Sequence, residues 1–157
     1  SGEGVKQDMP RAVKLYEKAV QEYEKRCNED LPSACRSLAL MWLHGKGVKK
    51  DELEAQRLMR KALSIYKLSC DEGNLIDCCW AASYYRDNEV LKKNEKRADE
   101  FLEQGVKQAR KMCEGGAAAG CNSLAVMYKE GLCGLPKDEK VSQEYLDQAR
   151  EILSSEQ

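Results

Sequence analysis

The spacing of the cysteines is the feature that most constrains how this chain folds. Six of the eight cysteines form three pairs whose members lie eight positions apart: Cys27/Cys35, Cys70/Cys78 and Cys113/Cys121. Corresponding members of successive pairs are 43 positions apart. A fixed period of roughly 20 to 50 residues indicates stacked supersecondary units, each of which contacts only its neighbours.

Other residue types recur with the same period. Each unit carries small residues at three fixed positions and an aromatic residue at a fourth. One extra residue near Leu132–Leu135 lengthens the last interval to 44. The recurring residues are Ala39, Ala82 and Ala125; Trp42, Tyr85 and Tyr128; Ala55, Ala98 and Ser142; and Ala62, Gly105 and Ala149. The alanines allow close helix packing, and the aromatic position, in phase with Leu38 and Leu124, favours the core over a binding stripe.

Each unit is expected to contain a short helix, a loop and a long helix, which in the first full unit occupy 34–44, 45–51 and 52–70. No segment shows the alternation typical of a strand. We therefore predict an all-α, right-handed α/α solenoid of about three and a half helix-pair repeats. It forms one domain over 1–157, with a half unit at 1–32 and units at 33–75, 76–118 and 119–157. We expect a monomer or a slice of a longer array.

The long helices have recognisable start signals. Asp51 is suited to cap the helix that follows it, and Glu54, three residues later, completes a capping box. Asp8 and Asn94 hold the same place in their units. Pro10 is then expected in the first turn of its helix, where a missing N–H does no harm.

Two loops, Gly2–Asp8 and Gly45–Asp51, share one pattern, as do the helical segments 11–19, 38–42 and 124–128 with their small and apolar residues. These segments resemble the Sel-one-like repeat (SLR) family, a relative of the tetratricopeptide repeats. The resemblance covers essentially the whole chain. The third unit departs from the pattern, because Asn88 and Val90 replace both loop glycines, so its loop is expected to differ in shape.

The paired cysteines also resemble the cysteine-rich branch of that family. This branch contains secreted or periplasmic bacterial proteins and a mitochondrial intermembrane-space factor linked to cytochrome oxidase assembly. The resemblance implies an oxidising compartment, with a secreted or periplasmic location favoured over the intermembrane space. It also implies that the short helices line the concave face of the solenoid.

The eight-residue spacing favours local disulfides. It places one cysteine at the end of a long helix and its mate at the start of the next short helix, within the roughly 5.5 Å between Cα atoms that a disulfide needs. Each bridge closes a small ring and contributes roughly 2.5 kcal/mol in the chain-entropy model. Zinc sites prefer closer spacings, which disfavours a metal site here. Metal binding and reduced buried thiols are the competing interpretations.

Two cysteines are left over, Cys79 and Cys133. Cys79 begins a short helix, whereas Cys133 lies beyond the far end of the next short helix. If stacked helices run parallel, the two lie on the order of 15 Å apart. We therefore expect two free thiols. A reactive thiol, an intermolecular bridge, and competition of Cys79 with Cys78 for Cys70 are the alternatives.

Composition and motifs exclude several function classes. Lys plus Arg (26) nearly balance Asp plus Glu (27), which gives no electrostatic case for nucleic acid or an anionic membrane. No apolar run approaches the roughly 20 residues that span a bilayer. His44 is the only histidine, and Gly45-x-Gly47 lacks the rest of a phosphate-binding motif. We predict no metal, no cofactor and no enzymatic activity.

The outward stripe of the short helices is the expected binding face. Its positions follow helical spacing, and their chemistry changes from unit to unit while the packing positions stay alike. An ordinary solvated face is the competing interpretation. The residues are Arg36, Leu40, Leu43 and His44; Cys79, Ser83, Arg86 and Asp87; and Asn122, Val126, Lys129 and Glu130.

These observations favour a protein- or peptide-binding adaptor, because solenoids offer extended surfaces and no catalytic constellation is visible. One alternative is a haem- or redox-linked assembly chaperone for a respiratory complex, as the mitochondrial relative implies. The other is penicillin binding with weak β-lactam hydrolysis, as in some bacterial relatives, although the chain has no Ser-x-x-Lys motif.

Overall fold

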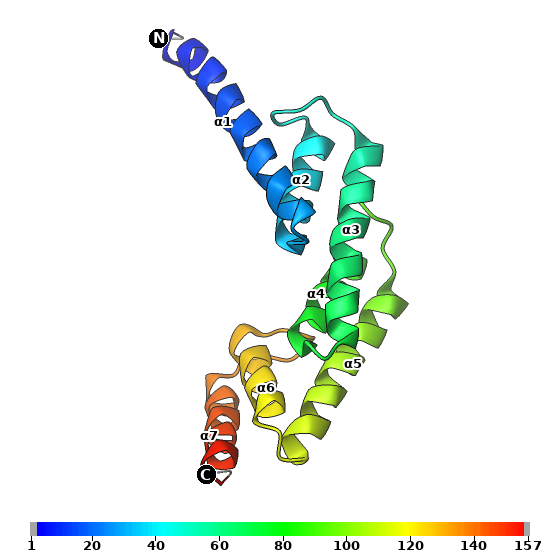
Figure 1. Ribbon diagram of the computed structural model, residues 1–157, viewed down its shortest axis with the longest axis vertical. Helices are drawn as coiled ribbons and strands as arrows, with labels where there is room; N and C mark the ends of the chain where they lie inside the picture. Colours follow the sequence, from blue (N-terminus) through cyan, green and yellow to red (C-terminus); the bar gives the residue numbers. More distant parts are fainter. Residues whose placement is uncertain (1–2, 156–157) are drawn as a thin grey trace. The chain divides into compact units, whose positions relative to one another are not determined.

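The computed structural model describes residues 3–155, with side chains from residue 9 onward, and this part of the chain is all-α (Figure 1). Long and short helices alternate, as the sequence predicts. The short helices begin at 32, 75 and 118, in steps of 43, and the later long helices begin at 52, 95 and 139. The seven are α1 (Glu3–Asn28), α2 (Pro32–His44), α3 (Glu52–Asp71), α4 (Leu75–Arg86), α5 (Glu95–Glu114), α6 (Ala118–Glu130) and α7 (Glu139–Ser155).

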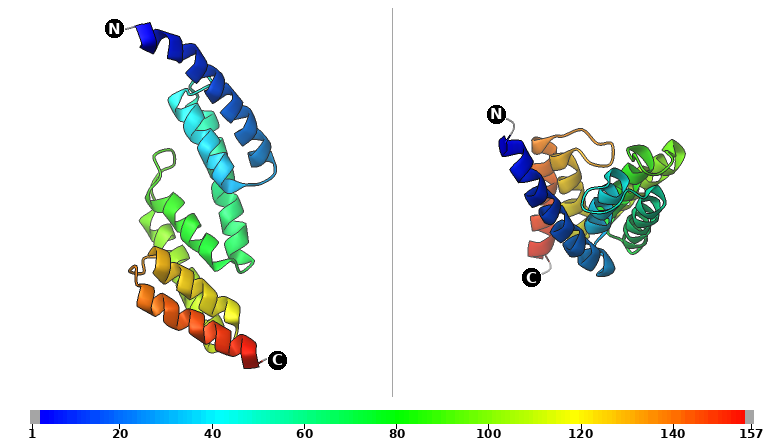
Figure 2. Two further views of the ribbon diagram at one scale, coloured as in Figure 1. Left: turned by 90° about the vertical axis from the view of Figure 1, so that its left-hand side faces the viewer. Right: turned by 90° about the horizontal axis from the view of Figure 1, so that it is seen from above.

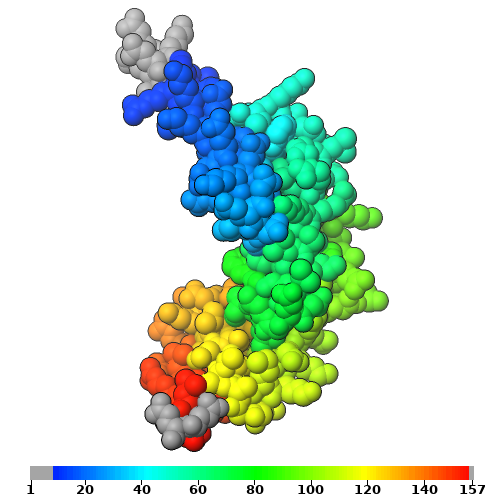
Figure 3. Space-filling view, viewed as in Figure 1, coloured from blue at the N-terminus to red at the C-terminus, as the bar shows by residue number. Residues whose placement is uncertain are grey.

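The chain divides into two compact units, which do not coincide with the repeat units; below, the first unit and the second unit mean these two. The first contains residues 1–65 and 89–92, and the second contains residues 66–88 and 93–157. In the first unit, α1 and α2 form an antiparallel pair joined by a short turn (Figure 2). In the second unit, α4 packs on α5, α5 on α6 and α6 on α7, and the side chains of α6 and α7 fill the space between their ribbons (Figure 3).

Helices α3 and α5 start at the predicted caps, and α7 starts at an equivalent one. The Asp51 carboxylate accepts hydrogen bonds from the backbone N–H groups of Leu53 (3.0 Å) and Glu54 (3.1 Å). Asn94 accepts from Arg97 N–H at 3.1 Å, and Asp138 from Val141 N–H at 3.0 Å. Each side chain therefore satisfies N–H groups that have no partner inside the helix.

The return half of the predicted capping box does not form. Glu54 turns to Arg57 and accepts two hydrogen bonds from its guanidinium, at 2.6 and 2.8 Å. The Asp51 N–H instead donates to the carbonyl of Trp42, the recurring aromatic position, at 3.0 Å. The same bond joins Asn94 to Tyr85 and Asp138 to Tyr128, both at 2.8 Å. One backbone bond per unit thus ties the cap of the long helix to the preceding short helix.

The loop predicted at Gly2–Asp8 is helical in the structure from Glu3 onward, so Asp8 does not stand at the start of α1 and Pro10 lies inside it. Gly2 lies outside the described residues. Apart from Gly4, residues 3–9 have no strong intrinsic preference against helix. Pro10 removes one backbone N–H from the helix, which costs stability but does not end α1 here.

The loop glycines are required where the first unit packs most closely. Gly47 has a φ of +73°, and a Cβ atom there would lie 2.6 Å from the backbone carbon of Tyr16 on α1. Gly45 ends α2 in the left-handed conformation, as Gly131 ends α6. In the repeat unit 76–118, Asp87 ends α4 with a φ of −121°, so the expected difference in this loop is present.

The recurring small residues are buried where helices approach one another. Ala55 and Ala98 are fully buried, and Ser142, at the same position of the last unit, is 4% exposed. The Ser142 hydroxyl donates to the carbonyl of Ala125 at 2.8 Å, which satisfies the one polar group at this position. Gly105 has little room for a side chain, because a Cβ atom would lie 3.0 Å from that of Cys78.

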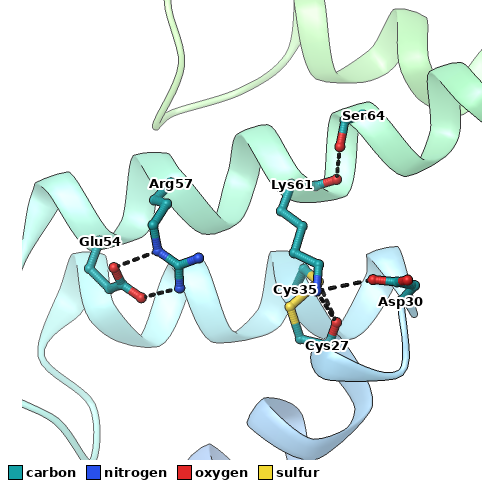
Figure 4. Close-up of a disulfide and its surroundings, with 7 residues drawn as sticks. All are labelled: Cys27, Asp30, Cys35, Glu54, Arg57, Lys61 and Ser64. Atoms are coloured by element: carbon teal, nitrogen blue, oxygen red, sulfur yellow. Dashed lines mark hydrogen bonds and ion pairs between the residues drawn. A yellow bond between two sulfur atoms is a disulfide. The ribbon is translucent and has the colours of Figure 1, made fainter.

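A lysine secures the junction between α1 and α2 in the first unit (Figure 4). The Lys61 ammonium, on α3, donates to the carbonyl of Cys27 at 2.7 Å and pairs with Asp30 at 3.0 Å. Cys27 lies in the last turn of α1, where a positive charge is favourable, and its carbonyl also accepts a hydrogen bond from the Asp30 N–H at 3.1 Å. The lysine therefore ties α3 to the turn that the Cys27–Cys35 disulfide closes.

The cap at Asp51 makes a testable contribution to stability. We expect Asp51→Ala to lower the free energy of unfolding by about 1 kcal/mol, because two N–H groups lose their acceptor. Asp51→Asn keeps an acceptor and should change the stability by only a few tenths of that. Urea unfolding followed by circular dichroism measures both variants, and equal losses would contradict the capping role.

Candidate binding site

Three disulfides join the cysteines that lie eight positions apart. The Cα atoms are 4.6 Å apart for Cys27–Cys35, 4.8 Å for Cys70–Cys78 and 4.6 Å for Cys113–Cys121. Each bridge links the last turn of a long helix to the first turns of the next short helix. These are the pairs expected from the spacing, and each holds a helix–turn–helix junction at its narrow end.

The expectation of two free thiols is wrong, because Cys79 and Cys133 form a fourth disulfide with their Cα atoms 4.8 Å apart. The expected separation assumed that Cys133 stays beyond the far end of a parallel helix. In the structure the loop after α6 turns back, with positive φ angles at Gly131 (67°), Cys133 (55°) and Gly134 (74°). The loop then lies along the face of α4 from Cys79 to Asp87.

The fourth disulfide is buried in the core of the second unit. Cys79 is 6% exposed and Cys133 8%. The Cys133 sulfur would lie 3.4 Å from a Cβ atom at Gly105, so the small residue in α5 leaves space for it. The signal that could have revealed the pair is the one-residue insertion near Leu132–Leu135, which coincides with Cys133, the one cysteine that lies in a loop.

The predicted face of the short helices is exposed in α2 and α6 but partly covered in α4. Arg36 and His44 are exposed, whereas Leu40 and Leu43 are half-buried. Asn122, Val126, Lys129 and Glu130 are all exposed. In α4 the disulfide takes Cys79 into the core, Asp87 is exposed, and Ser83 and Arg86 border a hollow of about 220 Å³ that the loop 131–134 closes on one side.

Two charged residues of this face already have partners. The Arg86 guanidinium donates to the Asp99 carboxylate on α5 at 2.6 Å. His44 lies 3.7 Å from a carboxylate oxygen of Glu89. In contrast, Arg36, Asn122 and Lys129 have no side-chain hydrogen bond or ion pair with another described residue. These three side chains remain available to a partner.

The recurring aromatic residues serve packing. Trp42, Tyr85 and Tyr128 are half-buried. Tyr85 stacks on Phe101 of α5 with ring centres 5.9 Å apart, and Tyr128 stacks on Tyr145 of α7 at 5.8 Å. In these two repeats the aromatic position thus joins the short helix to the following long helix.

A second exposed feature was not found from the sequence. Along α5 a groove of about 740 Å³ runs between the helix and the loop that carries Cys133 and Leu135. Leu102 and Val106 contribute apolar surface from the helix. Three exposed cations of the same helix line the groove, and their i, i+3, i+4 spacing was visible in the sequence: Lys107, Arg110 and Lys111.

The first unit has a smaller and more polar hollow, of about 200 Å³, beside Trp42. Its Glu54 and Arg57 bind each other (Figure 4). The hydrogen bond from Arg57 holds the pKa of Glu54 below its ordinary value and raises that of Arg57. This pair neutralises itself, so that Glu24 is the remaining charged residue that lines the hollow.

The described residues offer no metal centre and no membrane span. Over 3–155, with side chains from residue 9, no three His, Cys, Asp or Glu side chains gather as metal ligands. In that same part of the chain, none of the helices is both long enough and apolar enough to cross a bilayer.

The repeat frame has a counterpart among known families. The Sel1 repeat model matches residues 1–22, 32–65 and 118–151, more than half of the chain. The chain belongs to the Sel1 repeat family. The longest unmatched interval, 66–117, holds nearly all of the repeat unit 76–118, whose loop lacks the glycines found at Gly45 and Gly47. No curated protein matches this Sel1 repeat chain.

Two solved structures are similar to it. One is a Sel1 repeat protein from Oxalobacter formigenes, with 20% identity, coverage of 87% of this chain and 79% of the other, and a TM-score of 0.30. The second is a protective antigen present in uropathogenic Escherichia coli strains, displaying an SLR fold. Its identity is 16%, the coverage is 87% of this chain and 49% of the antigen, and the TM-score is 0.28. The chain thus spans about half the length of that antigen.

The fourth disulfide predicts a measurable pattern. Non-reduced, denatured protein should take up no iodoacetamide, and peptide mapping should join Cys79 to Cys133. Removing this bridge by Cys79→Ala with Cys133→Ala should cost about 4 kcal/mol of stability, because it closes a long segment. Removing Cys113–Cys121 in the same way should cost only about 2.5 kcal/mol. Alkylation of Cys79 and Cys133 before reduction would contradict the bridge.

Proposed function

We propose that this Sel1 repeat protein is a non-enzymatic scaffold that binds a protein or peptide on the outward face of its short helices. Repeat proteins of this kind offer surfaces built from equivalent positions of successive units. The packing positions stay alike from unit to unit, whereas Arg36 and Asn122, which occupy one frame position, differ in chemistry. A framework that holds variable side chains at fixed places is suited to recognition.

One observation carries the proposal. Arg36, Asn122 and Lys129 project from packed helices and have no side-chain polar partner among the described residues. Their helices are held by disulfides and by caps, so the side chains are presented from a rigid support. Rigid presentation lowers the entropy lost when a partner binds. Val126, which is 42% exposed and lies beside Asn122 and Lys129 on α6, adds an apolar contact.

The disulfides support function in an oxidising compartment. We favour a secreted or periplasmic protein. The redox- or haem-linked alternative comes from the resemblance to the mitochondrial relative, and free thiols at Cys79 and Cys133 would have supported it. Both of these sulfurs are joined in the structure. Peptide binding therefore needs the smaller set of assumptions, because it uses side chains that are already exposed.

Selection from a random peptide library displayed on phage tests this function. We expect wild-type protein to select a family of related peptides. Combining Asn122→Ala, Val126→Asp and Lys129→Glu should weaken their binding at least about tenfold, since the contacts of a binding site are concentrated in few residues. Fluorescence anisotropy measures the affinities.

A matched set of changes on α7 serves as the control. Gln148→Ala, Leu153→Asp and Lys140→Glu alter the same residue types at exposed positions and should leave the affinity within about twofold. Failure of the wild-type protein to select any related peptides would contradict the proposed function. Equal loss in both sets would show that the effect does not come from the short-helix face.

A further inference from the structure

The groove along α5 has an apolar interior and a charged outer edge. Leu102 and Val106 lie one turn apart on α5, and Leu135 and the buried disulfide atoms of Cys133 form the facing wall. All three aliphatic side chains are half-buried against the core of the second unit. The groove therefore presents apolar surface that is supported from beneath by packed residues.

The outer edge of the groove is positively charged at its centre. Lys107, Arg110 and Lys111 are exposed on one side of α5, and none has an ion pair with a described residue. Glu103 and Glu114 stand at the two ends of this edge and likewise form no ion pair there. The carboxylates lie eleven positions apart, which is about 16 Å along a helix. They limit the attractive field to a short segment between them.

The groove wall is fixed in place. Cys133 is tied to α4 by the disulfide with Cys79, and α4 is itself tied to α3 through Cys70–Cys78. Leu135 follows two residues later and its N–H bonds the carbonyl of Leu132 at 3.0 Å. A loop that is held in this way does not have to be ordered when a ligand enters, which favours binding.

We propose that this groove binds a short acidic peptide segment of another protein, with apolar side chains between the helix and the loop and carboxylates on Lys107, Arg110 and Lys111. The length between the two glutamates matches about five residues of extended chain. This inference rests on the proposed binding function, but it places a ligand on a long helix instead of the short-helix face.

A peptide fits the charge distribution better than a polyanion does. A nucleic acid or an anionic membrane favours an extended basic surface. Here three cations lie between two carboxylates, in a chain whose net charge is −1. A partner with a few carboxylates and one or two apolar side chains matches both the charged edge and the apolar interior.

The test uses a fluorescein-labelled peptide of sequence Glu-Leu-Glu-Glu-Leu-Glu and fluorescence anisotropy with the intact chain. We expect saturable binding that weakens as salt rises, because the charged contacts are exposed. Replacing the glutamates by glutamine, or the leucines by alanine, should weaken binding at least about tenfold. Amide chemical shifts in the second unit should move at Val106 and Leu135.

A charge-matched pair of protein variants locates the site. Lys107→Gln, Arg110→Gln and Lys111→Gln together should weaken binding of the acidic peptide at least about tenfold. Arg11→Gln, Lys14→Gln and Lys18→Gln remove the same charge from exposed positions on α1 and should change the affinity less than about twofold. Circular dichroism checks that both variants keep the wild-type helix content.

Several results would overturn the inference. The first is no binding of the acidic peptide at about 1 mM. The second is equal affinity for the two charge variants. The third is binding to phosphatidylserine vesicles, lost in the α5 variant, without binding of the peptide, which would identify a membrane surface instead. If the acidic peptide does not bind, while phage-selected ligands bind the wild-type protein and lose affinity for the α6 variant, the groove proposal fails and the proposed scaffold function stands.

Discussion

The disulfide at each helix junction is the constraint on which the rest of the structure depends. It fixes the end of a long helix to the start of the next short helix, with Cα atoms less than 5 Å apart. Because a repeat unit packs only on its neighbours, it has few distant contacts to correct an error in this turn. The cross-link, the N-cap and the bond from the cap N–H to the aromatic position's carbonyl therefore determine how the following helices are placed.

The sequence was sufficient for features that recur. The spacing of 43 between helix starts, the caps at Asp51 and Asn94, and the buried alanines all follow from the repeat, because an identical local pattern produces an identical local structure. The first short helix begins at Pro32, two residues before the predicted start at 34. The predicted start of α1 was wrong because the signals of the cap residue and the proline are weak beside the helix preference of the surrounding residues. The groove along α5 and the two smaller hollows could not be predicted, since each is lined by residues far apart in the sequence.

The Cys79–Cys133 disulfide is a feature that the repeat period does not determine. Both residues were found from the sequence, but their separation depends on the path of a single loop. That path is set by left-handed residues at 131, 133 and 134 and by the absence of a side chain at Gly105. Gly45 repeats the left-handed conformation of Gly131, but neither the left-handed Cys133 nor the glycine at position 105 has a counterpart in the other repeat units. Departures from the frame, such as the extra residue near Leu132–Leu135, are therefore the places where a repeat sequence indicates specialised structure.

The same departure distinguishes two surfaces of the second unit. Cys79 occupies the frame position of Arg36 and Asn122, which are exposed in their helices, and the disulfide instead directs it into the core. The bridge thereby removes one residue from the short-helix face and, at its other end, fixes the wall of the α5 groove. Reduction of this one bond would release the wall while leaving all three junction disulfides intact. The contribution of Cys79–Cys133 is thus local to the groove and the loop, whereas the junction bridges serve the repeat as a whole.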